Sequence, residues 1–132
     1  MAADWGTAVS STALTLTGSY ATVQHAAADL EIEVEPNEVL HALFDFDPQA
    51  AATEDGQVEI QASPDASNWD TDDNGIMAFT MSKDDDPSKR SVSLFGHRYY
   101  RFRAKVVDTD GTAGGDDTTS TLTVHYALGT MV

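Results

Sequence analysis

The most specific chemical pattern in this sequence is Asp70-Thr71-Asp72-Asp73-Asn74-Gly75. Oxygen-bearing side chains stand at its first, third and fifth positions and a glycine at the sixth, as in the first half of a calcium-binding loop. The second half is missing. The twelfth position is Met81, where such a loop needs a bidentate glutamate, and no helices are expected beside it. The pattern therefore excludes an EF-hand.

A looser Ca²⁺ site at Asp70, Asp72 and Asn74 stays open as an alternative. The remaining oxygen ligands would come from the aspartates at 84–86 or from the Asp-Thr-Asp-Gly turn at 108–111. Aspartate, asparagine and glycine are also the residues that hairpin turns use most, because they tolerate unusual backbone angles or bond to their own backbone. We favour the turn interpretation and predict no cofactor.

Other catalytic patterns are missing from the sequence. The histidines His25, His41, His97 and His125 have no HxH or HxxxH spacing, and the lack of cysteine leaves few ligands for a structural zinc site. The sequence has no Gly-x-Ser-x-Gly nucleophile elbow and no glycine-rich phosphate loop. We therefore predict a protein that is not an enzyme, with no catalytic residues.

Composition narrows the class of protein further. The chain has 132 residues, 41% of them hydrophobic, which suits one domain with its own core. Its net charge of -15 argues against binding to nucleic acid or to anionic membranes, since both require clustered cationic charge. No apolar run is long enough to cross a bilayer, and the N-terminus lacks the pattern of a signal peptide. We expect a soluble protein that is not exported by that route.

The positive charge is confined to one part of the chain, because all seven lysines and arginines lie between residues 83 and 105. The stretch at 98–107 carries most of them and is the clearest strand signal. Its alternation places two kinds of side chain on opposite faces, Tyr100, Phe102, Ala104 and Val106 against Arg101, Arg103 and Lys105. The basic face has two candidate partners: the glutamates at 31–35 on a neighbouring strand, or an acidic patch on another subunit.

The strand pattern predicts an all-β fold, a single antiparallel β-sandwich or jelly roll of about eight strands. The predicted strands are residues 12–17, 20–23, 29–35, 39–47, 57–63, 76–81, 92–95, 98–107 and 118–128. Residues 1–11 are small and polar apart from Trp5 and Val9, and we expect an N-terminal arm that orders only when it docks. Residues 12–132 would form the sandwich.

Three stretches resemble the pattern of small β-sandwich virion proteins of tailed bacteriophages: residues 62–70, Arg98-Tyr99-Tyr100-Arg101-Phe102, and the closing strand at 122–128. The resemblance implies a non-enzymatic capsid decoration or cement protein that binds the outer capsid and reinforces contacts between subunits. Its partners would be the major capsid protein and copies of itself. It would be made in the host cytoplasm and end on the capsid surface of the virion.

The residues expected at this interface are Trp5, Val9, Arg101, Arg103 and Lys105, with the N-terminal arm ordering on a neighbouring subunit. Two alternatives stay open. The first is a tail or neck component of the same virion. The second is a Ca²⁺-assisted carbohydrate-binding or adhesion module that stacks sugars on Trp69, Tyr99 or Tyr100, because similar sandwiches occur in such modules.

Overall fold

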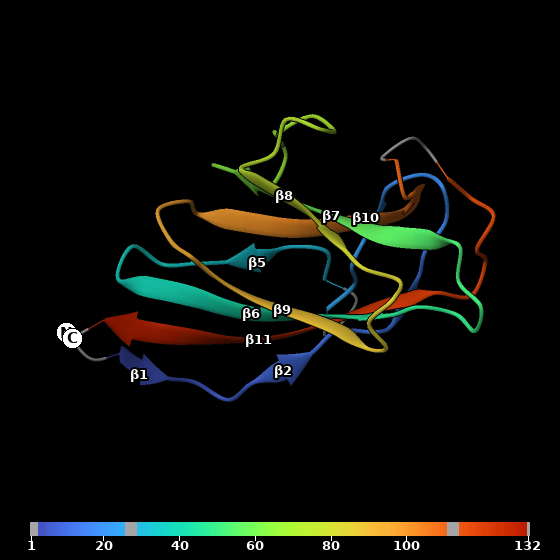
Figure 1. Cartoon of the computed structure of the whole chain (residues 1–132). Coiled ribbons are helices and arrows are strands. Elements are labelled where there is room, and N and C mark those ends of the chain that lie inside the picture. The colour runs from blue at the N-terminus through green and yellow to red at the C-terminus, as the bar shows by residue number, and fades with distance from the viewer. Residues whose placement is uncertain (1–2, 26–28, 111–113, 132) are drawn as a thin grey trace.

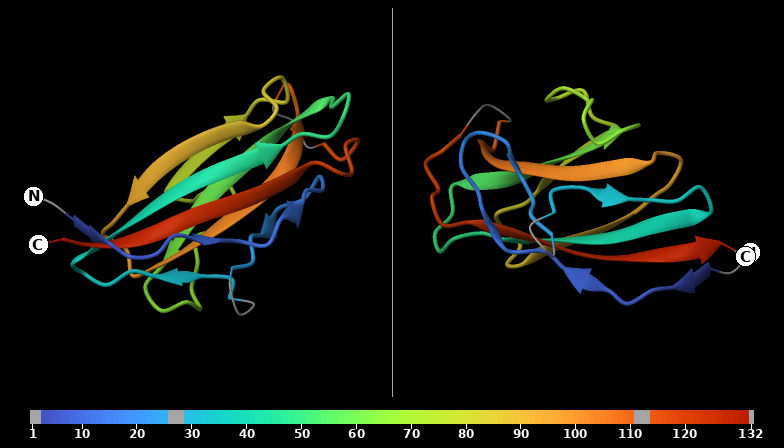
Figure 2. Two further views of the ribbon diagram at one scale, coloured as in Figure 1. Left: turned by 90° about the horizontal axis from the view of Figure 1, so that it is seen from below. Right: turned by 180° about the vertical axis from the view of Figure 1, so that it is seen from behind.

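The fold is an antiparallel β-sandwich, as predicted. The computed structural model describes residues 3–25, 29–110 and 114–131. Over these residues the chain forms a six-stranded and a five-stranded antiparallel sheet, which lie face to face (Figure 1). Two further views show the same two layers and place both chain ends at one end of the sandwich (Figure 2). In this part of the chain, no helix is long and apolar enough to cross a membrane.

We name each sheet by its central strand. The β11 sheet has the order β1-β11-β6-β9, and β2 and β3 also pair with β11. Its strands are β1 (Ala3–Trp5), β2 (Val9–Ser10), β3 (Leu14–Thr15), β6 (Glu38–Asp47), β9 (Ser88–Leu94) and β11 (Thr121–Met131). The β10 sheet has the order β4-β10-β7-β8, and β5 also pairs with β10. Its strands are β4 (Ala21–Thr22), β5 (Ile32–Glu33), β7 (Glu54–Ser63), β8 (Met77–Met81) and β10 (Tyr99–Asp108).

Strand β10 has the clearest strand pattern in the sequence and is a central strand of its sheet. Its apolar face is fully buried, as the alternation predicts: Tyr100, Phe102, Ala104 and Val106. The Phe102 ring meets Phe44 of β6 edge to face, with 4.9 Å between ring centres, and so joins the two sheets. The core therefore lies between β10 and β7 on one side and β11 and β6 on the other.

The N-terminal segment differs from the expected arm. Trp5 in β1 pairs with Gly129, and Val9 in β2 pairs with Tyr126, so the segment runs along the edge of β11 in its own chain. The predicted boundary after residue 11 marks no break, because β2 and β3 lie on either side of it and pair with the same strand. The physical reason is that β11 would otherwise present unpaired backbone groups along this edge.

Two predicted strands have different limits in the structure. The alternating stretch at 29–35 forms a strand only at Ile32–Glu33, although the Val34 N–H still donates to the Arg98 carbonyl at 2.7 Å. Strand β9 begins at Ser88 rather than at residue 92. It therefore includes Lys89 and Arg90, and it lies at the edge of its sheet. An edge tolerates charge that a central strand would not, and Arg90 stacks on the Phe79 ring at 4.4 Å.

His25 fills the space between the two sheets. Its ring stands edge-on to Phe102 of β10 and to Tyr126 of β11, with 5.8 Å and 5.3 Å between ring centres. The residue is only 3% exposed, and neither ring nitrogen has a hydrogen-bond partner among the described residues. Burial lowers the pKa of His25 below its ordinary value of 6.5, and the nearby Asp29 carboxylate opposes this only in part. The imidazole is therefore held neutral.

We expect acid to destabilise the fold through His25. The unfolded chain takes up a proton below about pH 6.5 that folded His25 resists, so the free energy of unfolding falls as the pH drops, and the stabilisation is complete above that pH. Urea titrations between about pH 7.5 and 5.5 measure this dependence. The variant His25→Phe fills the same space without titrating and should flatten it. Equal slopes for this variant and the wild type would contradict the assignment.

The contact between the sheets also predicts a large effect at Phe102. Phe102→Ala removes a fully buried ring, and we expect a loss of about 3–5 kcal/mol in the free energy of unfolding. Phe95→Ala is the matched control, because Phe95 is 73% exposed and its loss should change stability by about 0.5 kcal/mol or less. Denaturant unfolding of both variants checks the difference. Comparable losses would show that the core does not centre on this contact.

Candidate functional site

The candidate calcium loop lies on the outer face of the β10 sheet, within the connection from β7 to β8. That connection starts with a turn held by Asp65, whose carboxylate accepts N–H bonds from Ser67 and Asn68 at 2.9 and 2.8 Å. These bonds hold the pKa of Asp65 well below its usual range. Asp70 then takes the place of a strand partner beyond β8, since its Oδ2 accepts the Ala62 N–H at 3.0 Å. Asp70 therefore serves the sheet.

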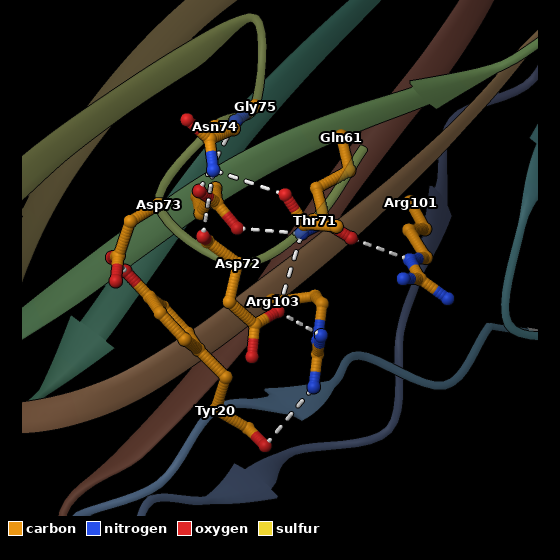
Figure 3. Close-up of polar contacts among 10 residues, drawn as sticks. Tyr20, Gln61, Thr71, Asp72, Asp73, Asn74, Gly75, Arg101 and Arg103 are labelled. Carbon is orange, nitrogen blue, oxygen red and sulfur yellow. Dashed lines mark hydrogen bonds and ion pairs between the residues drawn. The ribbon is translucent and has the colours of Figure 1, made fainter. Parts of the chain in front are cut away.

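Asp72 meets the basic face of β10. Its Oδ1 accepts hydrogen bonds from Arg103 Nη1, with which it forms an ion pair, and from Gln61 Nε2 at 3.3 Å (Figure 3). The Arg103 side chain is 19% exposed, and its Nη2 also donates to the Tyr20 carbonyl at 3.3 Å. The guanidinium thus supplies the positive charge that a metal ion would bring to this loop.

A buried polar layer underlies the loop. Glu59 and Gln61 of β7 are both fully buried, and Gln61 Nε2 donates to Glu59 Oε1 at 2.6 Å. Arg101 Nε donates to Gln61 Oε1 at 2.7 Å, and the Gly75 N–H donates to Glu59 Oε2 at 3.2 Å. Gly75 has to be a glycine here, because an added Cβ would lie 2.4 Å from the Ile60 carbonyl oxygen.

Aromatic rings complete the cover of the basic face. The Arg101 guanidinium stacks on Trp69 at 4.6 Å, and Lys105 Nζ lies 4.4 Å from the centre of the Tyr20 ring. The Tyr20 hydroxyl donates to Asp73 at 3.2 Å, and burial together with the charge of Asp73 raises the pKa of Tyr20. All three basic side chains of β10 are therefore engaged within their own chain.

This arrangement corrects the expected glutamate ladder. Strand β5 pairs Glu33 with Tyr99 and Ile32 with Tyr100, so the glutamates at 31–35 do not lie opposite the basic residues. Across from Arg103 on β7 stands Glu59, and the long β7–β8 loop supplies Asp72. Sequence reasoning identified both partners of the ion pair as candidates but did not bring them together, because nothing local shows where a long loop folds.

The residues of the carbohydrate alternative are poorly placed for stacking. Tyr100 is fully buried in the core, so it cannot meet a sugar. The guanidinium of Arg98 lies over the Tyr99 ring at 5.1 Å, and Arg101 covers one face of Trp69. The expected role of Tyr100 is therefore wrong, and no row of free aromatic faces is formed by these three residues.

A different group of acidic residues gathers at the opposite end of the sandwich. One oxygen each from Glu54, Asp108 and Asp116 lies within 4.8 Å of the others, whereas Asp70 and Asp72 belong to no such group among the described residues. Glu54 is fully buried and accepts N–H bonds from Gly115 and Asp117, at 2.8 and 2.7 Å. The Asp-rich turn at 108–111 was a sequence signal for this region, but Glu54 gave none.

A Ser-His-Asp line lies on the outer face of the β11 sheet. Ser10 Oγ and His125 Nδ1 are 2.6 Å apart, but His125 Nε2 lies 3.8 Å from Asp45 Oδ2, too far for a hydrogen bond that would orient the ring. The expected interface residue Trp5 lies on the same face, where its ring covers Gly129 and stands 5.9 Å from the His41 ring.

Comparison with known proteins bears on the fold. The sequence matches no family model and no curated protein. Among solved structures, the chain is similar to a protein of the Bacillus endospore appendages, which form a novel family of disulfide-linked pili. The TM-score is 0.54 and the identity 8%, over 100% of this chain and 93% of that chain. At this identity the likeness shows a common fold.

The loop over β10 predicts a stability effect at Asp72. Asp72→Asn removes the charge that neutralises Arg103, and we expect a loss of about 1.5 kcal/mol in the free energy of unfolding, the low end of the range for hydrogen bonds to charged groups, because the Asp72 side chain is 49% exposed. Asp84→Asn is the matched control, because its ion pair with Lys83 is 82% exposed on the Asp84 side and should contribute about 0.5 kcal/mol or less. Equal effects in denaturant unfolding would contradict this role of Asp72.

Proposed function

We propose that this chain is a non-enzymatic structural protein that acts by binding other protein subunits in a multi-copy assembly. The observation that carries the proposal is the use of the candidate chemical groups inside the fold. Asp70 continues a sheet, Asp72 neutralises Arg103, and Glu59 with Gln61 supports the loop from below. These groups are therefore engaged within the fold, and the surface of the sandwich is what remains for binding other proteins.

The Ser10-His125-Asp45 line supports the non-enzymatic reading. A catalytic histidine has to be oriented by its carboxylate, and the 3.8 Å separation here does not provide that bond. The line also lies on the open face of a sheet, where a substrate would gain little burial. A structural role for these side chains on the sheet surface requires neither feature.

The likeness to an appendage subunit gives the proposal a physical precedent. That protein belongs to disulfide-linked pili, and its fold matches over the whole of this chain. This chain has no cysteine, so it would hold its neighbours without disulfides. Contacts of many copies then add up, even where each contact is weak.

The finer proposal is a capsid decoration protein, and it is supported by the sequence resemblance to virion proteins. In this reading the partners are the major capsid protein and further copies of this chain, on the capsid surface of a virion. An appendage filament is the second candidate, supported by the shared fold. Both assign the same work to the sandwich, which is adhesion between subunits.

Immunogold electron microscopy tests the proposal. Antibodies raised against the purified chain are applied to cells and particle preparations of the source culture, and antibody preadsorbed with the chain is the control. We expect regularly spaced label on capsids. Label along filaments would retain the structural function and replace the capsid by an appendage. Label found only in the interior of cells, with none on capsids or filaments, would contradict a structural function.

A further inference from the structure

The outer face of the β11 sheet is uncharged over the half nearest the chain termini. Strand register sets this out in rows: Val39 pairs with Gly129, His41 with Ala127 and Ser93, and Leu43 with His125 and Ser91. Paired residues of an antiparallel sheet point to the same face. In these rows the described outward residues include no Asp, Glu, Lys or Arg. We call this surface the neutral face and define it by Trp5, Val39, His41, Leu43, Ser93 and Ala127.

Charge returns immediately beyond the neutral face. The next rows of the same sheet hold Asp45 with Lys89, and then Asp47. Two carboxylate pairs elsewhere on the surface lie close enough to act on one another: contact with Asp86 raises the pKa of Asp47, and contact with Glu33 raises that of Glu35. In a chain with a net charge of -15, an extended uncharged sheet face is a local exception.

The neutral face is also open, unlike the outer face of the other sheet. The β7–β8 loop and Tyr20 cover the β10 sheet, whereas Leu43 and Ala127 remain partly exposed at the centre of the β11 sheet. Two large apolar side chains stand at the termini end of the sheet: Trp5, 52% exposed, and Phe95, 73% exposed directly after β9. Exposed aromatic groups beside an uncharged surface are typical of protein interfaces.

We infer that the neutral face binds a second copy of this chain, face to face about a two-fold axis. This inference rests on the proposed function and names the contact through which the subunits associate. The occupant follows from charge. A cationic partner would be drawn to the acidic surfaces, whereas another copy is repelled by them and can approach closely only where both surfaces are uncharged.

The two-fold arrangement also keeps the carboxylates apart. With the axis lying between the two facing sheets, perpendicular to the strands and passing His41, the strands of the two copies run in opposite directions, and Asp45 and Asp47 of one copy fall beyond the Trp5 end of the other. An isologous contact of this kind uses the same patch on both copies. Stacked sheets lie about 10 Å apart, which is close to the Debye length at about 0.1 M salt, so opposed carboxylates would repel at that distance.

The patch is smaller than a standard protein interface. Strands about 4.8 Å apart and rows about 6.8 Å apart give roughly 300–400 Å² for four strands and three rows. A standard interface buries about 800 Å² on each partner. We therefore expect a weak pair contact, with a Kd between about 10 μM and 1 mM, which gains strength when many copies assemble.

Analytical ultracentrifugation over a range of protein concentrations tests the inference. In about 1 M NaCl, where the Debye length is about 3 Å, we expect wild-type protein to form dimers, because an apolar contact persists when charge is screened. Leu43→Glu and Leu43→Lys should each weaken dimerisation at least about tenfold, because either charge would be buried unpaired. Thr80→Glu is the matched control for Leu43→Glu, since it adds the same negative charge to an exposed strand position of the β10 sheet. This variant should dimerise as the wild type does.

Three results would overturn the inference: wild-type protein that stays monomeric to about 1 mM, a Thr80→Glu variant that dissociates as Leu43→Glu does, or a Leu43→Lys variant that dimerises normally. Thermal unfolding of each variant verifies that it is folded. Failure of the neutral face is distinguishable from failure of the proposed function. If Leu43→Glu protein still decorates particles or filaments in electron microscopy, the structural function stands and the contact lies elsewhere.

Discussion

The structure depends on strand β10, which has one apolar face and one basic face. The apolar face of β10 is fully buried, and its Phe102 ring packs edge to face against Phe44 of the opposite sheet. Once that face is fixed in the core, alternation forces the basic side chains to the outside of the same sheet. The chain is rich in carboxylates that can pair with these basic side chains, and the β7–β8 loop brings Asp72 next to Arg103. The core contact therefore also places the basic side chains against which this loop packs.

This arrangement makes the two outer faces of the sandwich unequal. The β10 sheet carries Arg101, Arg103 and Lys105, a buried polar layer and a covering loop, so its surface is occupied by the chain itself. Leu43 and Ala127 at the centre of the β11 sheet stay partly exposed, and the register of this sheet gathers uncharged residues over one half. The same segregation of charge that stabilises one sheet leaves half of the outer face of the other sheet uncharged.

The residues of the calcium-like pattern have structural roles in the sheet. Asp70, Asp72 and Gly75 stand at the expected spacing. Asp70 accepts the Ala62 N–H, Asp72 forms an ion pair with Arg103, and Gly75 leaves room for the Ile60 carbonyl. Oxygen ligands and glycine serve turns over a sheet as well as they serve metal ions, because both uses need compact acceptors and sharp bends.

The sequence by itself determined the class of fold and the inward face of β10, because strand alternation is a local property with a period of two residues. It also located the acidic loop and the basic stripe. Only the tertiary structure decided that these two meet, that the glutamates at 31–35 pair elsewhere, and that residues expected as an arm run along β11. Those outcomes depend on strand order and loop paths, which join residues far apart in the chain and leave no periodic signal in it.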